Sequence, residues 1–160
     1  MLLTLLLTIT AFSGIVTSAP AALEPRVIPG VTWTVKSFTR ICGTPYNNGI
    51  LICDYQFTIS SSPLKPDFAC RISDTGISAA PLPSSPVYNS FYSIGCNAHT
   101  GVDGGWVISW GYNSVYDFAV MTVVNRDLQQ DAWFGWNDVS KNSKFADVGP
   151  NLVYALGTFT

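Results

Sequence analysis

The sequence predicts an all-β protein, an antiparallel β-sandwich or β-barrel of seven to eight strands with two disulfides. Three observations support this prediction. Apolar and polar residues alternate in short runs, clusters of Gly, Pro, Asn and Ser separate those runs, and four cysteines occur within the first 100 residues. Helical apolar spacing over three turns is not found.

Composition narrows the class of protein further. Only 11% of the 160 residues are charged, against about 25% in an average chain. Eight Lys and Arg face ten Asp and Glu, for a net charge of -2, so the chain lacks the basic surface that a nucleic-acid partner needs. The high hydrophobic fraction of 48% argues against a disordered chain.

The amino-terminal segment divides the chain into three parts. Residues 1–18 form an apolar run that ends in small residues, as in a cleaved signal peptide. The alternative, a membrane anchor, needs about 20 apolar residues, and Thr, Ser and Gly interrupt this run. We therefore expect a signal peptide at 1–18, a flexible leader at 19–30 and a single all-β domain at 31–160. The mature protein is expected to be secreted, extracellular and free of the membrane.

Secretion makes the four cysteines candidates for disulfides, and four cysteines allow three pairings. Cys42 and Cys53 lie on either side of the Asn48-Gly49 turn signal, which favours a bridge across a hairpin. Cys70 and Cys96 enclose the Pro-rich stretch 81–86, which favours a second bridge at the base of a long connection. A metal site is not expected, because the chain has no CxxC motif and a single His.

Four strands are expected in the first half, at 31–39, 50–60, 66–72 and 91–97. In the second of them, one face carries Leu51, Cys53, Tyr55, Phe57 and Ile59. In the fourth, the same alternation places Tyr92, Ile94 and Cys96 on one face.

The second half continues the pattern after the turn residues 103–105. The run 106–112 alternates cleanly, and its aromatic face carries Trp106, Ile108, Trp110 and Tyr112. The run 115–124 is apolar on both faces, which is typical of a central strand. Shorter strands are expected at 132–136 and 152–159.

The segments 33–42 and 53–59, followed by Cys70 and by the Tyr-Ser-Ile-Gly-Cys of 92–96, resemble ascomycete small secreted proteins. The resemblance runs from Trp33 to about Asn137, and more distantly it is similar to the Alternaria allergen-like family. It implies a β-barrel with a Cys70–Cys96 bridge and a host-facing role as an effector, elicitor or allergen-like protein. It implies no catalytic site. The cysteine that links dimers in the allergen-like family has no counterpart before Trp33, so we do not expect a disulfide-linked dimer.

The late tryptophans suggest a binding surface. Trp106 and Trp110 lie at strand spacing, which favours a place in the core. The candidate binding surface consists of Trp133, Trp136, Gln130, Asp131 and Asn137. Trp133 and Trp136 are three positions apart, so they face opposite sides of an extended strand and at least one is expected to be partly exposed.

The sequence supports an enzymatic function less well than a binding function. His99 is the single His and no GxSxG motif is present. A carboxylate pair for glycoside hydrolysis remains open among Asp54, Asp103, Asp117, Asp131 and Asp138. Asp117 lies in an apolar run, where burial would raise its pKa; the alternative is a strand-end residue bonded to backbone amides. We assign no catalytic residue, metal or cofactor.

The sequence therefore predicts a secreted, non-enzymatic, effector-like fungal protein that acts at the host interface. Its partner would be an unidentified host protein or a cell-wall polysaccharide. The alternatives are a carbohydrate-binding module that uses exposed Trp side chains and a small secreted hydrolase.

Overall fold

The computed structural model describes residues 26–43, 52–62, 66–73, 90–97, 101 and 104–156, and these residues form eight strands. The strands are β1 (Val27–Gly43), β2 (Ile52–Ser62), β3 (Phe68–Ser73), β4 (Phe91–Gly95), β5 (Trp106–Asn113), β6 (Phe118–Asn125), β7 (Gln130–Asn137) and β8 (Val148–Ala155). Each overlaps a strand predicted from the sequence, so the all-β class is confirmed.

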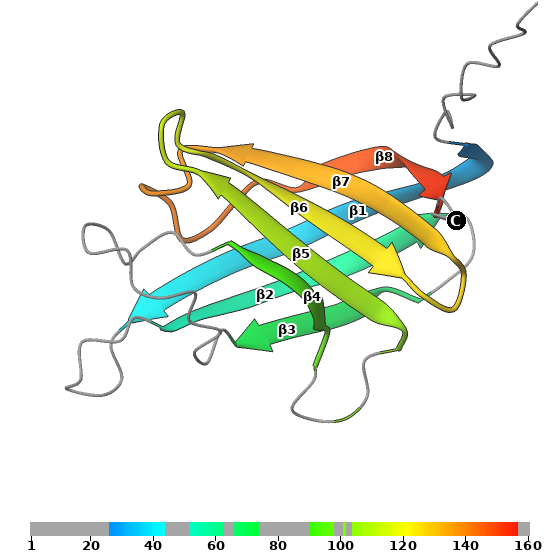
Figure 1. The fold of residues 1–160 in the computed structure, drawn as a ribbon, viewed down its shortest axis with the longest axis horizontal. Coiled ribbons are helices and arrows are strands. Elements are labelled where there is room, and N and C mark those ends of the chain that lie inside the picture. Colours follow the sequence, from blue (N-terminus) through cyan, green and yellow to red (C-terminus); the bar gives the residue numbers. More distant parts are fainter. Residues whose placement is uncertain are drawn as a thin grey trace, which may run out of the picture.

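All eight strands belong to one antiparallel sheet in the order β3-β2-β1-β8-β7-β6-β5-β4. The sheet curls until its two edge strands, β3 and β4, face each other and nearly close a barrel (Figure 1). Of the two predicted architectures, the barrel is the one formed. Strands that are consecutive in the chain are neighbours in the sheet, except β3 and β4, which lie at its two edges. The ladder between β1 and β8 pairs the first strand with the last.

The gap between β3 and β4 is closed by a disulfide and by one asparagine. Cys70 on β3 is bonded to Cys96, which directly follows β4. The backbone N–H of Asn97 donates to Arg71 O at 2.9 Å, and its side-chain oxygen accepts from Arg71 N–H at 2.9 Å. Asn97 Nδ2 also donates to the carbonyl of Ala69 at 2.9 Å. Asn97 therefore bonds to the edge of β3 as a neighbouring strand would.

The second disulfide, Cys42–Cys53, joins β1 to β2 between residues that are direct partners in the ladder. Both predicted pairings are therefore confirmed. The bridges lie at different places: one holds a hairpin together, and the other holds the two edges of the barrel together.

Aromatic side chains fill the interior of the barrel. The largest fully buried ones are Trp33, Trp110, Tyr55, Phe38, Phe91 and Phe134. Phe38 packs with its ring centroid 5.6 Å from that of Trp110 and 4.8 Å from that of Trp136. The predicted inward face of β2 is confirmed at all four described positions, Cys53, Tyr55, Phe57 and Ile59. Trp106 and Trp110 are buried, as their spacing predicts.

The predicted facing of 91–97 is wrong at Tyr92. Tyr92 is 76% exposed, whereas its neighbour Phe91 is buried against the core. Ser93 has a φ of 58°, and the register between β4 and β5 shifts between Phe91 and Ile94. This bulge adds one residue to the alternation, so Phe91 points inward on one side of it and Cys96 on the other.

The run 115–124 is shorter as a strand than predicted. Val115 and Tyr116 belong to a turn and are 80% and 76% exposed. The side-chain oxygen of Asn113 accepts hydrogen bonds from the N–H groups of both residues, which makes this turn locally favourable. The remainder, β6, lies between β5 and β7 and is central, as predicted.

The first strand begins earlier than predicted. β1 starts at Val27, where Val27 pairs with Tyr154 and the carbonyl of Arg26 accepts from Ala155 N–H at 2.9 Å. Residues 27–30, assigned to the leader from the sequence, therefore belong to the barrel. The predicted signal peptide at 1–18 lies outside the described residues, as does the leader up to residue 25.

Candidate binding surface on the outer face of the barrel

The five residues of the predicted binding surface all lie on β7, but they point in two directions. Burial alternates along the strand: Ala132, Phe134 and Trp136 are buried, and the residues between them are partly or fully exposed. Asp131, Trp133 and Asn137 therefore belong to the outer face of the barrel. The same alternation places Gln130 with Trp136 on the inner face.

Trp136 is part of the core and not of a binding surface. It is 6% exposed, and its ring lies 6.0 Å from Trp110 and 6.2 Å from Phe145 between centroids. Its Nε1–H donates to the carbonyl of Ala146 at 3.0 Å. A surface that includes both Trp133 and Trp136 is therefore excluded, because the wall of the barrel separates the two side chains.

Trp133 is the exposed member of the pair, at 42%. Its ring centroid lies 5.0 Å from that of Tyr154 on β8, and the two ring planes are tilted by 51°. Asn151 Nδ2 donates to the carbonyl of Trp133 at 2.6 Å, which links β7 and β8 beside the rings. Neither the Tyr154 contact nor the Asn151 contact is readable from the β7 sequence alone.

Two aliphatic residues extend this exposed surface. Leu152 lies two residues from Tyr154 on β8, so both share the outer face, and Leu152 is 52% exposed. Val27, the ladder partner of Tyr154, is 38% exposed. We call the set Trp133, Tyr154, Leu152 and Val27 the outer apolar patch.

Asp131 borders the outer apolar patch on the same strand as Trp133. It is the ladder partner of Tyr154 on one side and of Val124 on the other. Its Oδ1 atom is buried and has no hydrogen-bond partner among the described residues. Burial raises the pKa of the Asp131 carboxyl above its usual value. The margin of the patch therefore carries a carboxyl group that is partly shielded from water.

The other two predicted residues lie apart from this patch. Asn137 follows Trp133 by four positions, which at about 3.3 Å per residue separates them by about 13 Å along β7. Gln130 is at the opposite end of the strand, paired with Asn125 and Ala155. Sequence reasoning missed Tyr154 and Leu152; their spacing of two within the predicted strand 152–159 indicated a shared face, but not that this face adjoins Trp133.

Three of the carboxylates considered for catalysis, Asp54, Asp117 and Asp138, are engaged in structural contacts. Asp117 accepts from the N–H of Ser140 at 2.8 Å, from its hydroxyl at 2.7 Å and from the hydroxyl of Tyr112 at 2.9 Å. These hydrogen bonds, those of Ser140 foremost, lower the pKa of Asp117. Asp117 is thus the strand-end residue bonded to a backbone amide, and not a buried carboxyl with a raised pKa.

Asp54 pairs with Arg71 at 2.9 Å and Asp138 with Lys141 at 2.6 Å, both near the surface. His99 and Asp103 lie outside the described residues. Within the part of the chain that the structure describes, no group of three or more His, Cys, Asp or Glu side chains could hold a metal ion. Nor is any helix in that part long and apolar enough to cross a membrane.

The fold and this surface define a small disulfide-linked β-barrel with an exposed apolar patch on its outer face. Comparison with known families gives a more specific assignment: residues 34–158 match the family described as Effector TSP1. Because the match covers most of the 160 residues, the chain belongs to this effector family. The predicted effector-like class is confirmed, whereas the match does not extend to the Alternaria allergen-like family. No curated protein matches the chain.

Proposed function

We propose that this protein is a secreted, non-enzymatic effector that acts outside the cell by binding a host protein through the outer apolar patch. Membership of the effector family supports the host-facing role. The two disulfides support secretion, since such bonds persist mainly in oxidising compartments. An elicitor role is part of the proposal; an allergen-like role is not, because the matched family is an effector family.

The single observation that favours a protein partner is the composition and shape of the patch. Trp and Tyr are enriched among the residues that contribute most to protein interfaces, and here Leu152 and Val27 extend the aromatic pair with aliphatic surface. The 51° tilt between the two rings prevents a flat polysaccharide from stacking on both at once. A protein side chain can fill the angle between them.

The experiment that tests this proposal compares two exposed aromatic residues at different places on the barrel. Trp133→Ala removes the centre of the patch, and Tyr116→Ala is the matched control, in the β5–β6 turn and 76% exposed. Purified protein is applied to host tissue and the oxidative burst is measured. We expect Trp133→Ala to abolish the response and Tyr116→Ala to retain it. Equal oxidative bursts with both variants would show that the outer apolar patch does not contribute to the response.

A second measurement addresses secretion and disulfides. The mass of the protein recovered from the culture medium should correspond to a chain that begins near residue 19 and has no free thiol. Four free thiols in the secreted protein would contradict the proposed compartment. Hydrolytic activity that Asp117→Asn removes from a folded protein would contradict the non-enzymatic assignment.

Carbohydrate binding is the second candidate, and the arrangement of Trp133 and Asp131 is the observation that favours it. One sugar ring could stack on the exposed indole of Trp133, with the carboxyl group of Asp131 on the same face of β7 beside it. Retention on chitin, cellulose or β-glucan that Trp133→Ala and Asp131→Leu both abolish would support this function over the protein partner. Trp136 is not a useful target in this test, because it lies in the core.

A further inference from the structure

Asp131 is a carboxyl group within an otherwise apolar part of the barrel surface. It is the ladder partner of Val124 on β6 and of Tyr154 on β8. Trp133 follows it by two residues on the outer face of β7, and Val27 on β1 continues the row beyond Tyr154. A charge on Asp131 is therefore placed directly beside the aromatic pair of the outer apolar patch.

The Asp131 carboxyl lacks the contacts that normally stabilise a partly buried carboxylate. Its Oδ1 atom is buried and accepts no hydrogen bond, and no Lys or Arg among the described residues forms an ion pair with it. In contrast, Asp117 accepts three hydrogen bonds and Asp138 pairs with Lys141. Removal from water without a compensating donor favours the neutral acid over the carboxylate.

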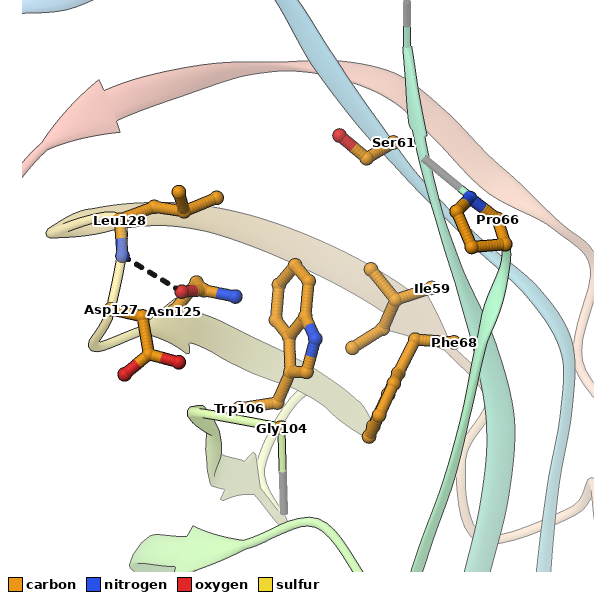
Figure 2. A pocket seen from close by; sticks show the side chains of 9 residues that line it. All are labelled: Ile59, Ser61, Pro66, Phe68, Gly104, Trp106, Asn125, Asp127 and Leu128. Carbon is orange, nitrogen blue, oxygen red and sulfur yellow. Dashed lines mark hydrogen bonds between the residues drawn. The ribbon is translucent and has the colours of Figure 1, made fainter. Parts of the chain in front are cut away.

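The elements around Asp131 supply no cation to it among the described residues. Their titratable or charged residues at this end of β7 are Tyr154 on β8, Arg126 and Asp127 in the β6–β7 turn, and Arg26 beside β1. Arg126 donates to Ser93 Oγ on β4 at 3.2 Å. Asp127 lines a hollow at the Trp106 end of the barrel (Figure 2). Burial is the cause that raises the pKa of the Asp131 carboxyl.

A partner that covers the outer apolar patch would withdraw the Asp131 carboxyl further from water. This desolvation costs more free energy for the carboxylate than for the neutral acid, so the partner binds the protonated form more tightly. Binding is then coupled to uptake of a proton, and it weakens as the pH rises through the range in which Asp131 ionises. Because one carboxyl takes up at most one proton, the binding constant changes by at most about tenfold per pH unit.

We propose that protonation of Asp131 controls binding at the outer apolar patch, so that the host protein binds more tightly in acidic extracellular fluid than at neutral pH. This inference rests on the function proposed for the patch and adds a regulation to it. The apolar residues Trp133, Leu152 and Val27 have no titratable group, so the patch would bind equally at both pH values without Asp131.

Retention on phenyl-agarose tests this proposal, because phenyl groups are apolar and uncharged at every pH. Native protein is compared with Asp131→Asn, which keeps the size of the side chain and cannot ionise. Asp138→Asn is the matched control, at a carboxylate that pairs with Lys141 near the surface. Between about pH 4 and about pH 7, at constant ionic strength, we expect retention of the native protein to fall at least about threefold. Asp131→Asn should lose most of this dependence, and Asp138→Asn should retain it.

Two further measurements keep the test decisive if Asp131→Asn fails to fold. The side-chain carboxyl carbon of Asp131 is titrated by ¹³C NMR in the native protein, and its pKa should lie above the ordinary aspartate value. Trp133→Ala should lower retention at every pH, which locates phenyl binding on the outer apolar patch.

Three results would overturn the proposal: an Asp131 pKa at or below the ordinary value, native pH dependence in folded Asp131→Asn, or native retention of Trp133→Ala. These results are distinct from a failure of the proposed function. That function fails if the oxidative burst does not depend on Trp133, whereas the measurements on Asp131 need no host tissue and refute the pH dependence alone.

Discussion

Replacing both Cys70 and Cys96 with alanine should lower the free energy of unfolding by about 3.5 kcal/mol. The magnitude follows from the length of the loop that the bridge closes. Its cysteines are 26 residues apart, for which the chain-entropy relation gives about 3.5 kcal/mol at 25 °C. The Cys42–Cys53 bridge spans 11 residues, and the same relation gives about 2.8 kcal/mol.

The position of the Cys70–Cys96 bridge should further increase the difference in stability loss between the two disulfide variants. Both cysteines are buried, and they join the two edges of the barrel. In the alanine variant the edges would be held chiefly by the three hydrogen bonds of Asn97 to Ala69 and Arg71. Cys42 and Cys53, in contrast, lie between strands that share a long ladder, which persists without the bridge.

Urea unfolding followed by circular dichroism measures both effects. With a slope of about 2 kcal/mol/M, the loss of the Cys70–Cys96 bridge should move the midpoint down by about 1.8 M. The Cys42→Ala/Cys53→Ala variant is the matched control and should move it less. A loss below about 1 kcal/mol for the Cys70–Cys96 variant would refute the chain-entropy argument, and a larger loss from the control would refute the role assigned to barrel closure.

Two further predictions concern residues singled out from the sequence. The pKa of Asp117 is lowered by its hydrogen bonds with Ser140, so the stabilisation is complete above the ordinary aspartate pKa and is lost as the pH falls through the lowered one. Asp117→Asn should therefore reduce stability at pH 7 and flatten its decline below about pH 4, which urea midpoints across pH would measure; parallel declines in both proteins would contradict this. Trp136→Ala should cost about 3–5 kcal/mol and Trp133→Ala about 1 kcal/mol, and a similar loss of thermal stability in the two variants would contradict their placement in the core and on the surface.

Much of the fold was predictable because its signals are local. A period of two along 50–60 and 106–112 reports which residues share a face, whatever strands adjoin them. The turn signal Asn48-Gly49 in the sequence predicted Cys42 opposite Cys53 for the same reason. The prediction failed where the sequence carries no local signal. The residues around Ser93 do not indicate the bulge that exposes Tyr92.

The sequence by itself determined that this protein is a disulfide-linked all-β domain of an effector-like class, and that Trp133 and Trp136 face opposite sides of one strand. Only the tertiary structure decided which of them is inside. The direction in which the sheet curls buries Trp136 beside Phe38, and pairing between β7 and β8 brings Tyr154 to Trp133. These outcomes depend on contacts between residues far apart in the chain, and the alternation within one strand is the same for either direction of curling.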